Sequence, residues 1–245
     1  MRNIKLIIQY DGSYYSGWQK QDDERLITIQ GEILKAIKNL SFEDVKLIAS
    51  GRTDKGVHAR MQVANFKTNT NIHPENYKMG VNRFLPDTIQ VIDAEEVPLE
   101  FNSRYDAKSK TYKYFLNNSQ FMHPCYIKYK GHVYKKMDKE KIIEATKLFE
   151  GHHDFASFMG RAKDVNTKRT IDKIDLEFID DDIIFTFKAE SFLRNMIRII
   201  IGSIIEVGKG KKDLDWVKNA LENGNRELSG PTADPSGLYL WEVIY

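Results

Sequence analysis

The polar run from Ser50 to Ala59 carries the residue types and spacing best suited to chemistry in this chain. It places one carboxylate, Asp54, between the cations Arg52 and Lys55, directly after an apolar segment at 45–49 that we expect to be a strand. A strand end fixes the position of the turn that follows, and neighbouring positive charge favours the ionised carboxylate. An ionised carboxylate is able to attack an electrophilic carbon without a metal. The competing interpretation is an Asx turn, in which the side chain of Asp54 bonds only its own backbone.

A second stretch, residues 104–141, combines cations with aromatic rings. It holds ten Lys or Arg residues, three acidic residues and eight aromatic residues. Lysines neutralise phosphates and aromatic faces accept unstacked bases, so this composition favours contact with RNA. Arg104 and Lys110 are candidate substrate-binding cations at its beginning. The alternative is a solvated strand and loop with ordinary core tyrosines.

Two arginines, Arg194 and Arg198, lie four residues apart in the apolar segment 193–207, which we predict to be a helix. Like charges at this spacing repel by roughly 0.2–0.5 kcal/mol, and a facing carboxylate or phosphate would relieve the repulsion. The alternative is that both side chains reach water along a solvent-facing stripe.

The composition limits the classes of protein to which the chain belongs. Its 245 residues, 41% of them hydrophobic, suffice for one large domain or two compact ones and argue against global disorder. The net charge of +2 says almost nothing about partners, and the single cysteine, Cys125, excludes an intrachain disulfide and a cysteine-rich zinc site. No export signal, membrane-spanning run or cluster of metal ligands is evident, so we expect no membrane partner, no metal and a reducing compartment.

The pattern of predicted elements repeats the order β-α-β-β-α-β, with one extra helix before the last strand. We predict strands at 4–10, 45–49, 62–68, 89–97, 111–116, 171–178, 183–189 and 238–244. We predict helices after the cap Thr28, from Pro74 to before Pro86, from the cap Asp138 to Gly151, over 193–207, and from the cap Asp213 to Gly224. This order is the split βαβ arrangement of ferredoxin-like and RRM-like domains. It predicts an α/β (α+β) fold with mostly antiparallel sheets, an N-terminal domain at 1–104, a C-terminal domain at 105–245 and a central active-site cleft.

The run GRTDKGVHA at 51–59 resembles the catalytic motif of the TruA-type tRNA pseudouridine synthases. The likeness extends along nearly the whole chain, through blocks at 10–19, 101–104, 110–114, 192–198 with 202–203, 230–233 and 237–240. The resemblance implies a two-domain α/β enzyme that forms a homodimer, needs no cofactor and binds tRNA rather than DNA. It also implies conversion of uridine to pseudouridine at positions 38, 39 and 40 of the tRNA anticodon arm, in the cytoplasm.

Four residues match functional positions of that family. Asp54 matches the catalytic aspartate, and Arg198 matches the arginine that pairs with it. Arg52 matches an arginine implicated in holding the site while the base is flipped, and Tyr112 matches the tyrosine that packs on the target base. Lys110 stands where an arginine is common in the family, which leaves the preference among the neighbouring uridines open.

Two chemical routes and two rival functions stay open at this point. Asp54 acts on the sugar carbon C1′ as a nucleophile, as in a retaining glycosidase, or it acts as a base on the 2′ hydrogen. Flipping the target base costs roughly a few kcal/mol, and stacking on Tyr112 returns about 1–3 kcal/mol. The first rival is a non-catalytic RNA-binding module of paired RRM-like units, in which Asp54 is replaceable. The second is a metal-dependent nuclease, which needs several converging carboxylates.

Overall fold

A computed structural model describes residues 1–23, 25–160 and 165–245 of the chain. Contacts between Cα atoms divide it into two compact units: unit 1 is Met1–Lys108 with Tyr239–Tyr245, and unit 2 is Ser109–Leu238. The predicted α/β class with mostly antiparallel pairing is confirmed. The predicted C-terminal domain at 105–245 needs a correction at its end, because the last strand groups with unit 1.

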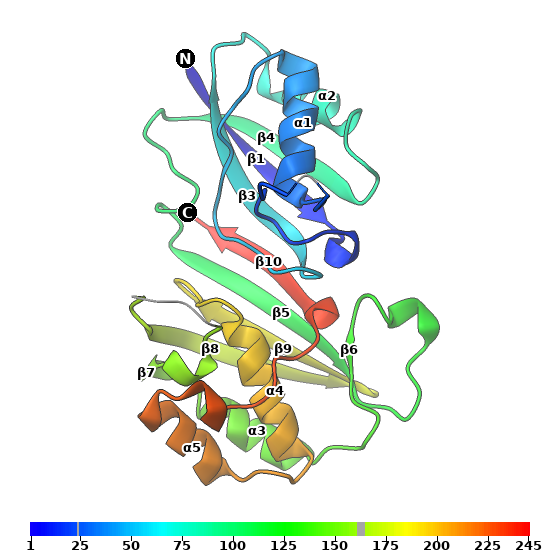
Figure 1. The fold of residues 1–245 in the computed structure, drawn as a ribbon, viewed down its shortest axis with the longest axis vertical. Coiled ribbons are helices and arrows are strands. Elements are labelled where there is room, and N and C mark those ends of the chain that lie inside the picture. The colour runs from blue at the N-terminus through cyan, green and yellow to red at the C-terminus, as the bar shows by residue number, and fades with distance from the viewer. Residues whose placement is uncertain (24, 161–164) are drawn as a thin grey trace. The chain divides into compact units, whose positions relative to one another are not determined.

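Unit 1 contains its elements in the predicted order (Figure 1). They are β1 (Arg2–Tyr10), α1 (Ile29–Ser41), β2 (Ile48–Ala49), β3 (His58–Thr68), α2 (Pro74–Asn82) and β4 (Ile89–Val97), with a short 3-10 helix at Gly12–Tyr14. Thr28 caps α1 as predicted, because its hydroxyl oxygen accepts a hydrogen bond from the Gly31 N–H. β2 is shorter than predicted, since the Leu47 carbonyl accepts from the Gln30 side chain of α1 instead of from a strand.

The sheet of unit 1 has the antiparallel order β4, β1, β3. The other edge of β3 is shared by two strands. β2 pairs antiparallel with it at Ala64 and Asn65, and β10 (Leu238–Ile244) pairs parallel with it at His58 and Ala59. The short β2 therefore pairs with only one stretch of β3. The stretch near His58 pairs instead with β10, the last strand of the chain.

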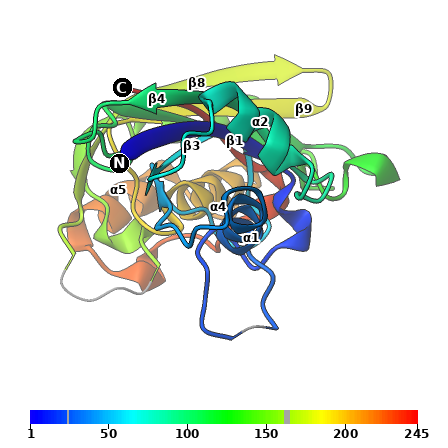
Figure 2. The same ribbon diagram turned by 90° about the horizontal axis from the view of Figure 1, so that it is seen from above.

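The core of unit 1 forms where alternate β1 residues meet the helices. The inward-facing Ile4, Leu6 and Ile8 are buried, as are the apolar faces of α1 and α2. The two helices contact each other, and α2 also contacts β4. In Figure 2, α1 is seen end-on, on one side of the layer that contains β1 and β4.

Unit 2 contains the remaining elements, which are labelled in Figure 1. They are β5 (Ser109–Asn117), β6 (Gly131–His132), α3 (Lys139–Lys147), β7 (Gly151–Asp154), β8 (Lys168–Ile179), β9 (Asp182–Ala189), α4 (Met196–Gly208) and α5 (Leu214–Asn223). Its sheet has the antiparallel order β5, β9, β8, β7, and β6 lies parallel to β5. The apolar helix α4 is almost entirely buried and contacts α3, which in turn contacts α5.

Two helix boundaries of unit 2 differ from the prediction. α3 ends at Lys147 instead of Gly151, because Gly151, with φ of +93°, begins β7. α4 begins at Met196 instead of residue 193, because Asn195 adopts a left-handed conformation with φ of 60°. Asp138 and Asp213 cap α3 and α5 as predicted. Over the described ranges, the helices are too short or too polar to cross a membrane.

Candidate active site

Asp54 lies in the loop between β2 and β3, and the backbone of this loop is held at several points. The Ser50 N–H donates to the Val63 carbonyl of β3 (2.8 Å), and the Thr53 carbonyl accepts from the Trp18 N–H (3.1 Å). The carbonyl of Asp54 accepts from the Val57 N–H (3.1 Å) and so closes a turn. The Asp54 side chain is half-buried. A carboxylate on a turn held in this way has a defined position, as a nucleophile requires.

Two buried side chains of the sheet hydrogen-bond to the same loop. The Gln62 amide donates to the Gly51 carbonyl (2.8 Å) and accepts from the Ser50 hydroxyl (2.7 Å). The Tyr10 hydroxyl and the Thr53 hydroxyl lie 2.8 Å apart. Burial raises the pKa of the Tyr10 phenol, so it stays protonated and able to donate a hydrogen bond.

The glycines of the 10–19 block allow its backbone to lie directly on the Asp54 loop. A Cβ atom at Gly12 would overlap the carbonyl oxygen of Val57. Gly17 has φ of +98°, and a Cβ there would lie 2.9 Å from the Thr53 carbonyl oxygen. Only glycine combines this close approach with that backbone conformation. The two blocks at 10–19 and 51–59 therefore form one structural piece.

His58, at the start of β3, joins this piece to the end of the chain. Its Nδ1 atom accepts from the Gly12 N–H (3.1 Å) and lies 3.2 Å from a carboxylate oxygen of Asp11. Its ring stacks on Tyr239 of β10, with 4.5 Å between the ring centroids. The His58 ring therefore links the 10–19 block to β10.

The other two predicted residues of unit 1, Arg52 and Arg104, are exposed cations. Arg52 lies in the Asp54 loop, two residues before the carboxylate. The guanidinium of Arg104 lies over the ring of Tyr105, 5.4 Å from its centroid. The segment before Arg104 is anchored by Ser103, whose N–H donates to the Asn65 side chain (2.9 Å). Both arginines therefore suit contact with phosphate groups.

Tyr112 lies within β5 of unit 2, where the sheet fixes its backbone. Its register partner on β9 is Phe187, and its ring meets Phe192 edge-on with centroids 5.3 Å apart. The side chain is 8% exposed. Lys110, two residues earlier on the same strand, is half-buried and has Ala189 as its register partner. Both side chains point to the same face of the sheet, because strand residues two apart do so.

Arg198 lies near the start of α4, and its guanidinium donates hydrogen bonds to two partners. Its Nε donates to the Ala233 carbonyl (2.8 Å), and one terminal nitrogen donates to the Asn195 side chain (3.3 Å). The Ala233 N–H donates back to the Arg198 carbonyl (3.0 Å). The guanidinium therefore has a defined position within unit 2.

Two glycine positions bring the Ala233 segment against α4. A Cβ atom at Gly202 would overlap the carbonyl oxygen of Pro231, and a Cβ at Gly230 would lie 2.5 Å from the Ser203 nitrogen. The Ser203 hydroxyl accepts from the Gly230 N–H (2.8 Å). The blocks at 202–203 and 230–233, far apart in sequence, thus form one contact that positions the partner of Arg198.

The predicted stripe of Arg194 and Arg198 on one helix face is wrong. Arg194 is exposed and precedes α4, and the left-handed Asn195 separates it from the first helical turn. Its carbonyl accepts from the Gly160 N–H (2.9 Å). Arg198 alone is part of the helix and is held by hydrogen bonds.

The aromatic residues of the 104–141 stretch separate into two groups. Tyr112 and Tyr114 are buried, whereas Tyr105, Tyr126 and Tyr134 are exposed. The Tyr114 hydroxyl donates to the Asp234 carbonyl (2.9 Å). Burial, followed by the nearby charge of Asp234, raises the pKa of Tyr114. Part of the stretch is thus ordinary core, as the alternative interpretation held.

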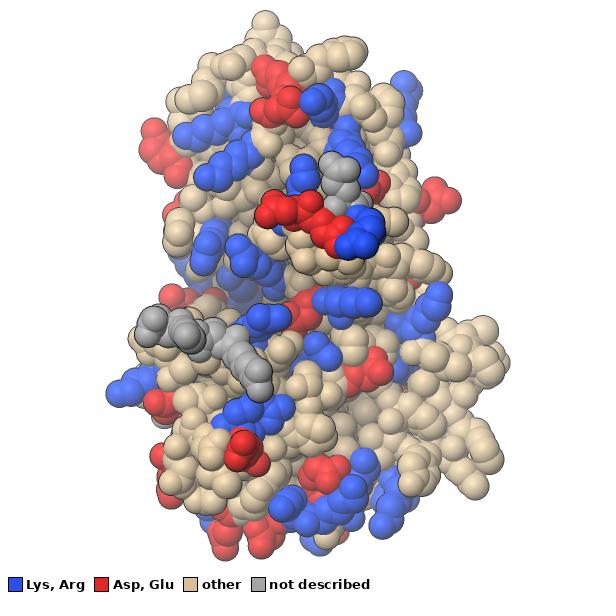
Figure 3. All heavy atoms as spheres, viewed as in Figure 1, with Lys and Arg blue, Asp and Glu red and all other residues tan. Residues whose placement is uncertain are grey.

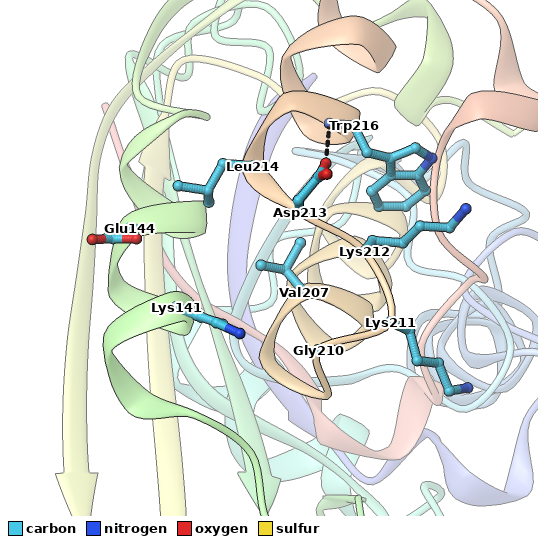
Figure 4. Close-up of a pocket in the computed structure, with 9 residues that line it drawn as sticks. All are labelled: Lys141, Glu144, Val207, Gly210, Lys211, Lys212, Asp213, Leu214 and Trp216. Carbon is cyan, nitrogen blue, oxygen red and sulfur yellow. Dashed lines mark hydrogen bonds between the residues drawn. The ribbon is translucent and has the colours of Figure 1, made fainter.

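A pocket in unit 2 lies apart from the predicted residues of that unit (Figure 4). Among its lining residues, Lys211 pairs with Glu206 (3.3 Å), and Lys212 lies over the Trp216 ring, 5.2 Å from its centroid. Asp213 caps α5 through the Trp216 N–H. Where α3 and α5 lie in Figure 3, Lys and Arg atoms are mixed with Asp and Glu atoms. The lining mixes three lysines with Glu144 and Asp213, so its charges do not indicate one class of ligand.

Tyr10, Gln62 and His58 were not singled out from the sequence. Gln62 is one of several polar residues of β3, so its residue type alone gave no signal. Within the three described ranges, no group of three or more His, Cys, Asp or Glu residues is placed to hold a metal ion.

Comparison with known proteins gives two kinds of match. The model of a family described as tRNA pseudouridine synthase matches residues 6–106 and 145–245. A protein named tRNA pseudouridine synthase A from Finegoldia magna is 50% identical over 246 residues, with 100% of both chains covered. A protein of the same name from Acetivibrio thermocellus is 44% identical, and one named tRNA pseudouridine synthase A 2 from Clostridium perfringens is 42% identical, each with 100% of both chains covered.

Proposed function

The chain belongs to the tRNA pseudouridine synthase family and is an isomerase, and from that premise we propose its target and its mechanism. The target is uridine at positions 38, 39 and 40 of the anticodon stem-loop of tRNA. The mechanism is an Asp54-dependent rearrangement of the glycosidic bond after the base is flipped. Family membership decides against the two rival functions, a non-catalytic RNA-binding module and a metal-dependent nuclease.

The observation that carries this proposal is the anchored position of Asp54. A carboxylate oxygen attacks C1′ of the ribose, and the bond from N1 to C1′ breaks. The base turns, C5 bonds to C1′ as the carboxylate leaves, and the proton on C5 departs while N1 gains one. Atoms balance without an oxidant, a reductant or a co-reactant. Displacement of the carboxylate would slow this reaction sharply, because a misplacement of about 1 Å costs on the order of 100-fold in rate.

The remaining predicted residues have supporting roles in the proposal. Tyr112 is the stacking surface for the flipped base, and its ring is fixed by the edge-on contact with Phe192. Arg198 supplies positive charge that favours the ionised carboxylate, and its own hydrogen bonds to Ala233 and Asn195 fix its direction. Arg52, Arg104 and Lys110 contact the RNA backbone. The proposal extends to a homodimer in the cytoplasm; light scattering of the purified protein tests the dimer, and cell fractionation tests the compartment.

Substitution of the carboxylate tests the proposal directly. Asp54→Asn keeps the size of the side chain but removes the anion, so we expect at least about a 1000-fold loss of pseudouridine formation with folding and tRNA binding unchanged. The measurement is pseudouridine mapping on tRNA with uridine at 38, 39 or 40. Asp44→Asn is the matched control, since Asp44 is an exposed carboxylate of the same unit that pairs with Lys38 (2.9 Å).

Two results would contradict the proposal at different levels. Turnover by Asp54→Asn within tenfold of the wild type rejects Asp54 as the nucleophile. Pseudouridine formed by the wild type only outside positions 38 to 40 rejects the proposed target.

A further inference from the structure

We propose that Tyr10 and Gln62 are positioning residues that hold the Asp54 loop in its reactive conformation. The inference rests on the proposed function, since it assigns these side chains to the geometry of the same carboxylate. Neither residue is expected to touch the substrate, because both are buried in unit 1.

Gln62 fixes the point where the loop leaves β2. Its side chain is fully buried and uses both ends of its amide, with the nitrogen on the Gly51 carbonyl and the oxygen on the Ser50 hydroxyl. Because one side chain holds two successive residues, the direction of the chain toward Asp54 is set by β3. A buried amide cannot exchange these partners for water without a cost of about 1–3 kcal/mol.

Tyr10 fixes the residue immediately before the carboxylate. The hydroxyl of Thr53 is bound by Tyr10, and the carbonyl of Thr53 is bound by the backbone of Trp18. The rings of Tyr10 and Trp18 also pack on each other, with centroids 6.0 Å apart. Thr53 is thus held from its side chain and from its backbone, which leaves Asp54 little freedom.

A bulge in the strand pairing accompanies this arrangement. Along β1, Ile8 pairs with Gln62 and Tyr10 pairs with Ala59, so three steps on β3 oppose two steps on β1. Bulges of this kind re-aim side chains and are frequent beside active sites. Gln62 and Tyr10 thus bind the loop at neighbouring points, Gln62 at Ser50 and Gly51 and Tyr10 at Thr53. Removal of either side chain should loosen the loop at its own attachment point.

A double-mutant cycle separates positioning from general stability. Tyr10→Phe and Thr53→Val remove the two sides of one hydrogen bond, so we expect each to lower kcat about tenfold at an unchanged KM for tRNA. The double variant should lose no more than a single variant, and Thr53→Ser should restore kcat to within about twofold. Gln62→Glu keeps the acceptor for Ser50, loses the donor to Gly51 and buries a carboxyl group, so it should lower kcat at an unchanged KM and also lower stability.

Tyr77→Phe is the matched control for a purely structural effect. Tyr77 is a buried tyrosine whose hydroxyl lies 2.6 Å from the Thr70 hydroxyl, beyond the opposite end of β3. We expect it to lose a similar amount of stability while kcat stays within about twofold of the wild type. If Tyr10→Phe and Tyr77→Phe lower kcat equally, or if the cycle is additive, Tyr10 has no positioning role.

Amide hydrogen exchange of residues 50–58, measured without RNA, keeps the test independent of turnover. Faster exchange of this segment in Tyr10→Phe and Gln62→Glu, but not in Tyr77→Phe, supports the inference. Unchanged exchange overturns it. A wild type that forms no pseudouridine in any tRNA rejects the proposed function, while the exchange result still decides whether these residues order the loop.

Discussion

The two units hold their candidate site residues by different means. In unit 1, Asp54 lies in a loop, and dedicated buried side chains from β1 and β3 bind that loop. In unit 2, Tyr112 lies in the interior of β5 and Arg198 lies in α4, so regular hydrogen bonding fixes the backbone of each. The position of a loop residue depends on polar side chains, whereas the position of a strand or helix residue depends on packing of the whole element.

This difference predicts different consequences of mutation. Loss of a polar clamp in unit 1 should change the reaction more than the stability, because a single hydrogen bond contributes only about 1 kcal/mol to folding. Loss of packing in unit 2 should change stability and activity together, because the element that carries the residue moves as a whole. Each of the following experiments breaks or sharpens this contrast.

The largest effect expected in unit 2 comes from the arginine that α4 carries. Arg198→Met retains the apolar stem and removes the charge, and we expect about a 100-fold loss of kcat, equivalent to about 2.7 kcal/mol. Arg194→Met, an exposed residue just outside the helix, should stay within about threefold of the wild type. Steady-state kinetics on an anticodon stem-loop RNA measures both. Equal losses for the two variants would show that bulk positive charge, and not the fixed guanidinium, matters.

Much of the fold was predictable from residues that mark the ends of helices and strands in the sequence. β4 and β10 match the predicted strands 89–97 and 238–244 residue for residue, since Pro98 follows the first and Gly237 precedes the second. β2 was overestimated because the Leu47 carbonyl bonds Gln30, a partner 17 residues away that no local pattern reveals. The start of α4 was misplaced because the break falls at the left-handed Asn195, where no glycine or proline marks it in the sequence.

The candidate site was predictable only where the chemistry is local to one run of residues. The 51–59 motif predicts Asp54 as the catalytic carboxylate, and the structure describes how its loop is anchored. Tyr10 and Gln62 were missed because their roles depend on the register between β1 and β3, which periodicity alone does not determine. Roles for Arg52, Arg104, Lys110 and Tyr112 stay predictions, as does the role of Arg198, which the Arg198→Met variant tests.

A glycine in each unit tests the contrast at the level of packing. Gly202→Ala in α4 places a Cβ against the backbone carbonyl of Pro231, so we expect the free energy of unfolding to fall by about 2 kcal/mol. We also expect a lower kcat, because the Ala233 contact to Arg198 shifts. Chemical denaturation and kinetics measure the two effects.

Gly80→Ala in α2 is the matched control for this substitution. Its Cβ meets only the end of the Leu40 side chain, which is flexible, and alanine favours the helix by about 1 kcal/mol. We expect stability within about 1 kcal/mol of the wild type and unchanged kcat. A large loss of stability in Gly80→Ala, or no loss in Gly202→Ala, would contradict this prediction. It would show that the cost does not depend on whether the added Cβ meets backbone or a side chain.

The smallest effect concerns the buried tyrosines, Tyr10 in unit 1 and Tyr114 in unit 2, whose pKa values are both raised, chiefly by burial. A raised pKa means that the folded state keeps a proton that the unfolded state loses above about pH 10. Each tyrosine therefore contributes stability that is fully present below pH 10 and declines above it, by up to about 1.4 kcal/mol per pH unit.

Tyr114→Phe should cost about 1 kcal/mol at pH 7 through the lost hydrogen bond to the Asp234 carbonyl, and Tyr10→Phe a similar amount. Denaturation between pH 9 and about 11 should show a shallower alkaline decline in either variant than in the wild type. Kinetics at pH 7 then separates the units: if Tyr10 is a clamp, only its variant combines a small stability loss with a tenfold lower kcat. A Tyr114→Phe variant that loses kcat equally, at the same stability, would show that a core hydrogen bond in unit 2 affects the reaction as much as the loop clamp does.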